Sequence, residues 1–319
     1  MISTDNFVFA INATLPVFLV ILLGRLLNKI GILTEGFCKP ANTYVFKVAL
    51  PVSLFSSVAG MDLYSDFNLS FFLFCAGATT VMFMGVWAVS ALCLKDKTLV
   101  GEFAQAAARS SAAILGLAFA VNIYGNTGMV PMMIVAAVPL FNMYSVVILS
   151  FSQSAEDGQT RKNRIIQAAV NAAKNPIIIG VLLGLPFALL KIKLPTVLSS
   201  TVSTVGGTAT PVALLVVGAS FSKTEALKRA RLASAAAAVK LFLLPLVFLP
   251  IAAILGFRNS ELVAIMIMVG SPTTVSCYVM AKNMKAEGVL TSNTVLLSTL
   301  FSSVSITLWL YVLKTLKLI

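Results

Sequence analysis

The sequence contains no histidine, and its four cysteines lack the spacing of metal ligands. Without histidine, neither a His-based catalytic site nor a His proton relay is available. Cys38, Cys75, Cys93 and Cys277 lie in or beside apolar segments, where a thiol packs as a small apolar side chain. Nothing else supplies a nucleophile with its base or a set of metal ligands. We therefore expect no cofactor, no metal site and no enzymatic activity.

Charged residues are also scarce. They make up 11% of the chain, against about 25% in soluble proteins, and the mean hydropathy is +0.98. Apolar segments of about the 20 residues that cross a bilayer as a helix recur along the chain. They predict ten membrane spans, at residues 7–28, 40–60, 68–94, 103–124, 128–150, 175–190, 197–221, 232–255, 260–281 and 289–313. Because helices satisfy their own backbone groups in lipid, we predict an all-α polytopic protein of the lipid bilayer.

The basic residues report membrane topology. Lysine and arginine number 23 and aspartate and glutamate 11, for a formal charge of +12. With the N-terminus outside, fifteen basic residues fall in inner loops, five in outer segments and three within spans. This positive-inside distribution argues against a nucleic-acid partner. We expect a multi-pass protein of the cell inner (plasma) membrane with both termini on the non-cytoplasmic side. The first predicted span lacks the flanking features of a cleaved signal peptide.

The two halves of the chain match at a constant offset of 160 residues. The matched pairs include Pro16 with Pro176, Gly24 with Gly184, Pro51 with Pro211 and Gly128 with Gly288. Prolines and glycines in one ungapped register are harder to obtain by chance than apolar matches. We therefore divide the chain into a first five-helix repeat (1–150), a cytoplasmic linker (151–174) and a second five-helix repeat (175–319).

Five spans per half is an odd number, so the second repeat must enter the membrane from the opposite side. Inverted repeats of this kind are common in secondary transporters, which bind substrate near the middle of the membrane, where corresponding helices are broken. The ninth predicted span carries such an interruption at Gly270-Ser271-Pro272-Thr273-Thr274, because proline removes a helix hydrogen bond.

Subtracting the offset from this interruption leads to Ser110-Ser111-Ala112 in the fourth predicted span, with Gly116 beyond it. Serine can bond locally to the backbone and weaken a helix, although small-residue helix packing is the alternative interpretation. We predict that both spans break near mid-membrane. The helix N-termini after the two breaks would then form an anion site, since each carries about half a positive charge.

Three basic residues fall inside predicted spans: Lys47, Arg109 and Lys240. At 1.5 Å rise per residue, each lies roughly 12–13 Å from the inner face. Intramembrane cations are costly and usually functional, so we predict that they contact an anion; snorkelling to the interface is the alternative. The candidate substrate-binding residues are Arg109, Ser110, Ser111, Gly270, Ser271, Pro272, Thr273, Thr274, Asn42, Lys47 and Lys240. The candidate helix breaks or hinges are Pro51, Gly116, Pro211 and Pro272.

No aspartate or glutamate lies in the middle of any predicted span. A cation-coupled carrier usually holds Na⁺ or a proton on a buried carboxylate, so its absence favours uncoupled export of an organic anion. The membrane potential would drive that export by about 2.3 kcal/mol per charge per 100 mV. Backbone carbonyls also bind Na⁺, which leaves a Na⁺- or H⁺-coupled importer of bile-acid-symporter type as the alternative. A membrane sensor or scaffold would leave the repeat unexplained.

Several ordered segments resemble the auxin efflux carrier family, which includes bacterial malonate-type carriers and plant auxin carriers. They include VALPVSLFSSVAG (48–60), KNPIIIGVLLG (174–184), ATPVALLVVGASF (209–221) and TSNTVLLSTLFSSVSITLWL (291–310). The resemblance covers nearly the whole chain. It implies an inverted five-plus-five fold with a scaffold domain and a transport domain, whose elevator-like movement carries small carboxylates such as malonate or auxin-like anions.

The resemblance also implies that spans four and nine cross at their broken points. This chain has Ser111 and Ala118 where family members often carry asparagine and proline. We therefore expect the first crossing segment to be less unwound than the second. The substrate, the oligomeric state (a homodimer is one alternative) and the direction of transport are left open by the sequence.

Overall fold

The computed structural model is all helical over the residues that it describes, which are 4–60, 67–112, 120, 123–124, 127–153, 170, 174–220 and 223–319. Its α-helices are α1 (Thr4–Lys29), α2 (Glu35–Tyr44), α3 (Leu50–Ala59), α4 (Leu69–Cys93), α5 (Val100–Ala108), α7 (Val130–Gln153), α9 (Pro176–Leu189), α10 (Thr196–Gly207), α11 (Ala209–Ala219), α12 (Lys223–Ala238), α13 (Leu244–Ile254), α14 (Asn259–Gly270), α15 (Ser276–Asn283) and α16 (Val289–Thr315). Two π-helical turns, η1 (Val45–Ala49) and η3 (Val239–Leu243), and the 3₁₀ turn η2 (Lys97–Leu99) join some of them.

Among the described residues, five helical stretches are long and apolar enough to cross a membrane. Within the described part of the chain they are Leu69–Cys93, Val130–Ser152, Thr196–Ala219, Leu227–Ile254 and Val289–Thr315. Each of the ten predicted spans overlaps at least one helix, but several of these helices are short or interrupted. The all-helical membrane class is therefore confirmed, while the count of ten spans stays a prediction.

Prolines explain both π-helical turns. Each turn directly precedes a Leu-Pro pair, with proline at Pro51 after η1 and Pro245 after η3. Proline has no N–H for the carbonyl four residues earlier, and its ring crowds that carbonyl. The helix widens just before the proline, and the leucine N–H bonds to the carbonyl five residues back. Candidate break Pro51 therefore marks a widened turn inside a continuous helix.

Pro211 follows a one-residue interruption at Thr208, whose backbone stays in the right-handed helical region (φ −71°, ψ −18°). The carbonyl four residues before it belongs to Gly207, where α10 ends, and α11 starts at Ala209. The hydroxyl of Thr208, between the two helices, lies 2.9 Å from the hydroxyl of Tyr44 in α2. This bond connects the junction of α10 and α11 to the end of α2.

The missing proline N–H at position 245 also creates a contact between distant helices. The carbonyl that it leaves without a helical donor belongs to Leu241, and the indole Nε1 of Trp309 in α16 donates to that oxygen at 2.9 Å. The hydrogen bond that the Leu241 carbonyl lacks within its own helix is thus supplied by a side chain of α16.

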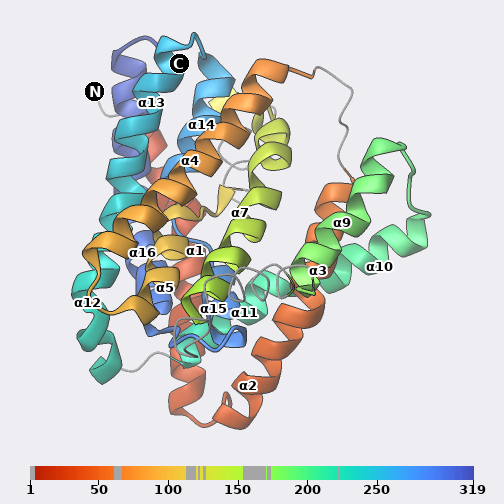
Figure 1. Cartoon of the computed structure of the whole chain (residues 1–319), viewed down its shortest axis with the longest axis vertical. Helices are drawn as coiled ribbons and strands as arrows, with labels where there is room; N and C mark the ends of the chain where they lie inside the picture. The colour runs from red at the N-terminus through yellow and green to blue at the C-terminus, as the bar shows by residue number, and fades with distance from the viewer. Residues whose placement is uncertain are drawn as a thin grey trace.

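The buried apolar side chains form two main clusters, and both draw on the two halves of the sequence. The first cluster joins α4, α5, α7, α13, α14 and α16. The second joins α1, α2, α9, α11 and α15 with one side of α7 and α16. In Figure 1, α3, α9 and α10 lie on one side of the molecule and α4, α13 and α14 on the other.

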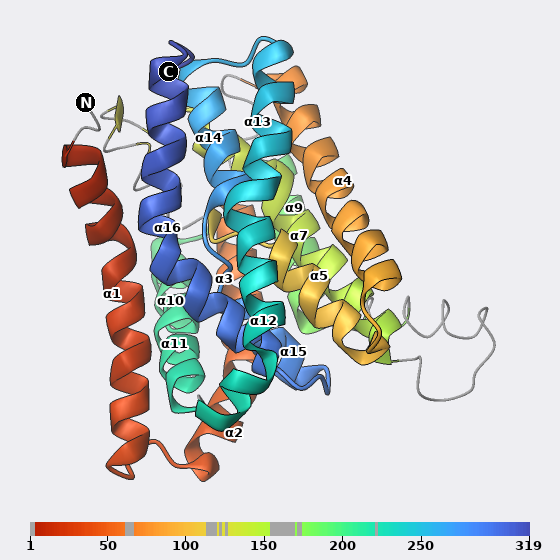
Figure 2. The same cartoon turned by 90° about the vertical axis from the view of Figure 1, so that its left-hand side faces the viewer.

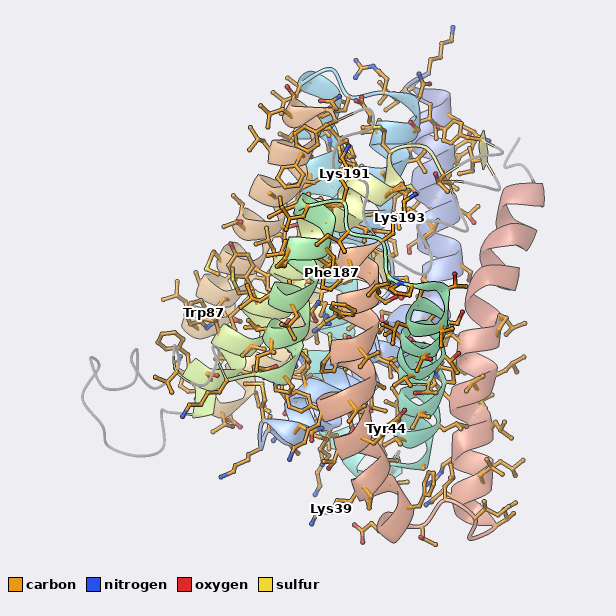
Figure 3. All side chains as sticks on the ribbon, turned by 90° about the vertical axis from the view of Figure 1, so that its right-hand side faces the viewer. Lys39, Tyr44, Trp87, Phe187, Lys191 and Lys193 are labelled. Atoms are coloured by element: carbon orange, nitrogen blue, oxygen red, sulfur yellow. The ribbon has the colours of Figure 1, made fainter. Side chains whose placement is uncertain are left out.

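The ends of the chain lie at one end of the molecule. The start of α1 and the end of α16 are both at this end, and α2 is at the opposite one (Figure 2). Figure 3 places Lys39 at the α2 end and Lys191 and Lys193 nearer the other end. This matches the predicted assignment of Lys39 to the inner side and the other two to the outer side, although the sides themselves stay a prediction.

A buried carboxylate caps the N-terminus of α16. Glu102 of α5 is 1% exposed. It accepts hydrogen bonds from the N–H of Gly288 at 2.7 Å, and from the N–H and hydroxyl of Thr291 at 3.3 and 2.9 Å. A negative charge at a helix N-terminus interacts favourably with the helix dipole. Glu102 thereby joins α5 to α16 at the end opposite the chain termini.

We expect Glu102→Gln to lower the free energy of unfolding by about 2 kcal/mol, because hydrogen bonds to a charged acceptor are the strong ones. Thermal or denaturant unfolding of the purified protein in detergent measures this change. Glu287→Gln is the matched control, since its carboxylate is 39% exposed and bonds to Arg229 at the surface. Equal losses in the two variants would contradict a special role for Glu102.

We expect Trp309→Phe to cost about 1–3 kcal/mol of stability, because it leaves the Leu241 carbonyl buried without a donor. Trp87→Phe removes the other tryptophan of the chain, whose ring packs on Phe151 with centroids 5.5 Å apart, and serves as the control. The thermal unfolding midpoints of the two variants measure how much the bond from Trp309 to Leu241 contributes to stability. A smaller shift for Trp309→Phe than for Trp87→Phe would show that the bond to Leu241 contributes little.

Candidate functional site

The ninth predicted span is interrupted at the place expected from its proline. Helix α14 ends at Gly270, Ser271 is extended with ψ 157°, and α15 begins at Ser276. The residue before a proline is driven out of the helical region by the proline ring, which accounts for the conformation of Ser271. Gly270 is needed for close packing, because a Cβ there would lie 2.8 Å from Cγ of Pro245.

The fourth predicted span is interrupted as well, without a proline. Helix α5 ends at Ala108, Arg109 is extended with ψ 135°, and residues 109–111 are outside helix before Ala112 returns to it. This interruption covers three residues, whereas the second covers the five from Ser271 to Val275. Gly116 and Ala118 lie outside the described residues, as does most of the segment that follows the first interruption.

The two interruptions contact each other directly. The N–H of Ser111 donates to the carbonyl of Pro272 at 2.9 Å, and the hydroxyl of Ser110 donates to the carbonyl of Met268. Segments 158 residues or more apart in sequence thus bond through the backbone groups that the helix breaks set free. The crossing of these two segments is the candidate site.

Threonines of the second interruption complete this network. Thr273 donates from its hydroxyl to the carbonyl of Ala106 in α5 at 2.7 Å, and from its N–H to the hydroxyl of Ser298 in α16 at 3.0 Å. The hydroxyl of Thr274 lies 3.3 Å from that of Ser276 at the start of α15. Helix α15 follows directly, and the N–H groups of Cys277 and Tyr278 in its first turn bond to the carbonyls of Thr274 and Val275 at 3.1 and 3.0 Å.

Arg109 lies at the crossing with its guanidinium buried. Its side chain is 5% exposed, and it donates to Oδ1 of Asn142 in α7 at 2.5 Å and to Sδ of Met280 in α15 at 2.6 Å. These partners are neutral. Over the part of the chain that the structure describes, the ion pairs are those of Arg229 with Asp96 and Glu287. The guanidinium thus has no counter-charge there, which is a suitable environment for an anion.

Lys240 is buried at the same crossing, on the side of the helix C-termini. Its ammonium, fully buried, donates to the carbonyls of Ala108, Met268 and Val269 at 3.2, 3.4 and 2.8 Å. These carbonyls belong to the last turns of α5 and α14. Three acceptors account for the three ammonium hydrogens. The observed contacts place the ammonium against the C-terminal ends of α5 and α14. The direct anion contact expected for Lys240 stays a prediction.

Two further candidates lie away from the crossing. Lys47, in η1, has an exposed side chain. Asn42 of α2 is buried, and its carbonyl accepts from Nδ2 of Asn283 at the far end of α15 at 3.3 Å. The structure therefore gathers Arg109, Lys240 and the residues of the two interruptions, but it does not bring Lys47 to them.

Some buried polar atoms at the crossing have no hydrogen-bond partner among the described residues. They include Oγ of Ser271 and Oε1 of Gln105. Nε2 of Gln105 does have a partner, since it donates to the carbonyl of Cys277 at 3.1 Å. Outside the crossing, Oδ1 of Asn42 and Oγ of Ser145 also have no partner in the part of the chain that the structure describes. A hydroxyl and a guanidinium at one crossing can together bind a carboxylate, since both donate hydrogen bonds.

Sequence reasoning missed four residues that complete the site: Gln105, Asn142, Met280 and Ser298. Asn142 and Gln105 are amides inside apolar spans, a signal that was available because such residues are rare in lipid. Ser298 is one of many hydroxyl residues in α16, and nothing in the local pattern distinguishes it. Met280 could not be found, because its role depends on which face of α15 meets Arg109.

Known membrane transport proteins resemble this chain over nearly its whole length. The profile of the membrane transport protein family matches residues 9–310. An uncharacterized transporter of Methanothermobacter thermautotrophicus is 25% identical over 311 residues, which cover 96% of this chain and 99% of the relative. The uncharacterized transporter YfdV of Escherichia coli K12 is 26% identical over 316 residues, covering 95% of this chain and 98% of YfdV. The resemblance to auxin efflux carriers is thereby confirmed: the chain belongs to the membrane transport protein family.

Proposed function

We propose that this protein is a secondary carrier of a small organic anion, such as a dicarboxylate or an auxin-like carboxylate. The observation that carries the proposal is the environment of Arg109. The guanidinium of Arg109 is buried and bonds to an amide oxygen and a thioether sulfur, and no carboxylate among the described residues pairs with it. Intramembrane charges of this kind mark substrate or ion pathways.

The hydroxyls and helix ends at the crossing add suitable donors. Ser271 carries a buried hydroxyl without a described partner, and α15 begins at Ser276, so the positive end of its dipole lies beside the second interruption. We propose that the anion binds between Arg109 and this helix end. Ser110, Ser111, Thr273 and Thr274 would then hold the two interrupted segments in position, since their groups already bond across the crossing or beside it.

The finer architecture belongs to the same proposal. An inverted repeat of five plus five spans is supported by the helix bounds, because α14 (Asn259–Gly270) and α16 (Val289–Thr315) start 159 residues after α5 (Val100–Ala108) and α7 (Val130–Gln153). The two apolar clusters support a division into a scaffold and a moving transport domain. We propose elevator-type alternating access in the cell inner membrane, with both termini on the non-cytoplasmic side.

Flux measurements in proteoliposomes test the proposal. We expect uptake or release of radiolabelled malonate or indole-acetate to follow an imposed membrane potential, at about 2.3 kcal/mol per charge per 100 mV, without Na⁺ or a pH gradient. Sodium-dependent uptake would favour the coupled importer instead. Absence of flux for every anion of a broad panel would favour a sensor or scaffold.

Arg109→Ala tests the site. We expect it to weaken anion binding at least about tenfold, which corresponds to about 1.4 kcal/mol, with folding retained. Affinity can be measured by scintillation proximity on purified protein, with size-exclusion profiles as the check on folding. Lys39→Ala removes an equal charge from an exposed position in the middle of α2 and is the control. An affinity unchanged by Arg109→Ala would remove Arg109 from the site.

A further inference from the structure

The ammonium of Lys240 lies where two helices present their carbonyl ends. Helix α5 ends at Ala108 and α14 at Gly270, and the ammonium bonds to Ala108 of the first and to Met268 and Val269 of the second. Each helix C-terminus is equivalent to about half a negative charge. Two such ends total about one negative charge, which one ammonium neutralises.

The local sequence holds the ammonium in this position. Lys240 belongs to the π-helical turn η3, which Pro245 imposes and Trp309 stabilises through the Leu241 carbonyl. Its side chain is completely buried. The ion pairs of the described residues do not include it, so backbone carbonyls alone accept its hydrogen bonds there.

Convergent carbonyls from interrupted helices are the ligands that transporters use for monovalent cations. Hard cations prefer oxygen ligands, and a cluster of carbonyl oxygens can replace a hydration shell. In this chain the ammonium of Lys240, which is covalently part of the protein, lies among these carbonyls in place of a free cation.

We propose that Lys240 is a tethered substitute for a small monovalent cation, and that the crossing of α5 and α14 becomes a binding site for Na⁺ or a small alkylammonium ion when the lysine is removed. The proposal goes beyond the transport of an anion, because it concerns which cation stabilises the carbonyl ends of α5 and α14. It holds whether or not the proposed substrate class is correct.

The first experiment measures thermal unfolding of purified protein at constant ionic strength in NaCl, methylammonium chloride or N-methyl-D-glucamine chloride. We expect the midpoint of the wild type to be the same in all three salts. We expect Lys240→Ala to unfold at a lower temperature in N-methyl-D-glucamine, and to regain several degrees with saturable dependence in Na⁺ or methylammonium, which fit the space left by the side chain.

Two variants provide matched controls. Lys240→Met removes the charge but fills the space, so we expect it to be destabilised without recovery by any cation. Lys228→Ala removes an exposed charge from the same long helix, and we expect it to behave as the wild type does in every salt.

Three results would overturn the proposal. One is a midpoint of Lys240→Ala that does not differ between the salts. Another is saturable stabilisation of the wild type by Na⁺, which would place a cation site beside the lysine. The third is failure of both Lys240→Ala and Lys240→Ser to give folded protein when they are prepared in Na⁺ or methylammonium, since either ion should replace the ammonium.

Where the carrier shows anion flux, a second measurement separates this inference from the proposed function. We expect flux of the wild type to be independent of Na⁺ and flux of Lys240→Ala to require it. Cation-dependent stability without any flux would support the tethered cation and count against the carrier. Flux of Lys240→Ala that is equal with and without Na⁺, together with salt-independent stability, would reject the tethered cation alone.

Discussion

The structure depends on how two interrupted helices satisfy their free backbone groups away from water. A helix that ends inside a membrane protein exposes carbonyls that cost several kcal/mol if they remain unpaired. Here the ends of α5 and α14 bond to the ammonium of Lys240, to the hydroxyls of Ser110 and Thr273, and to each other's extended segments. The crossing is stable because each break supplies donors for the other.

This arrangement separates the two buried cations by role. Lys240 faces the negative ends of α5 and α14, and its hydrogens are occupied by carbonyls. Arg109 starts from the same crossing, but its guanidinium reaches α7 and α15, where it meets neutral partners. One positive charge therefore faces helix C-termini, while the other meets only neutral partners among the described residues. The sequence alone made both residues candidates for an anion contact, because both are cations at a similar depth in apolar spans.

Proline accounts for much of the local irregularity, and its effect depends on what surrounds it. Pro51 and Pro245 widen a continuous helix into a π-helical turn, Pro211 lies just beyond a short junction at Thr208, and Pro272 lies in a five-residue gap. The first interruption, at Arg109, has no proline and is nevertheless extended. Its conformation is held by bonds to the second interruption, so tertiary contacts override local helix preference there.

The membrane class, the family and the positions of both helix interruptions followed from the sequence. Apolar length, an offset of 160 residues and the chemistry of proline and serine are local or periodic properties, and they can be read along the chain. The partners of each side chain depended on the tertiary structure. Lys47 and Lys240 occupy the same kind of π-helical turn before a Leu-Pro pair, yet one side chain is exposed and the other fully buried. The difference arises because only packing decides which face of a helix meets the crossing, and a rotation of one residue moves a side chain by about 100° around the helix axis.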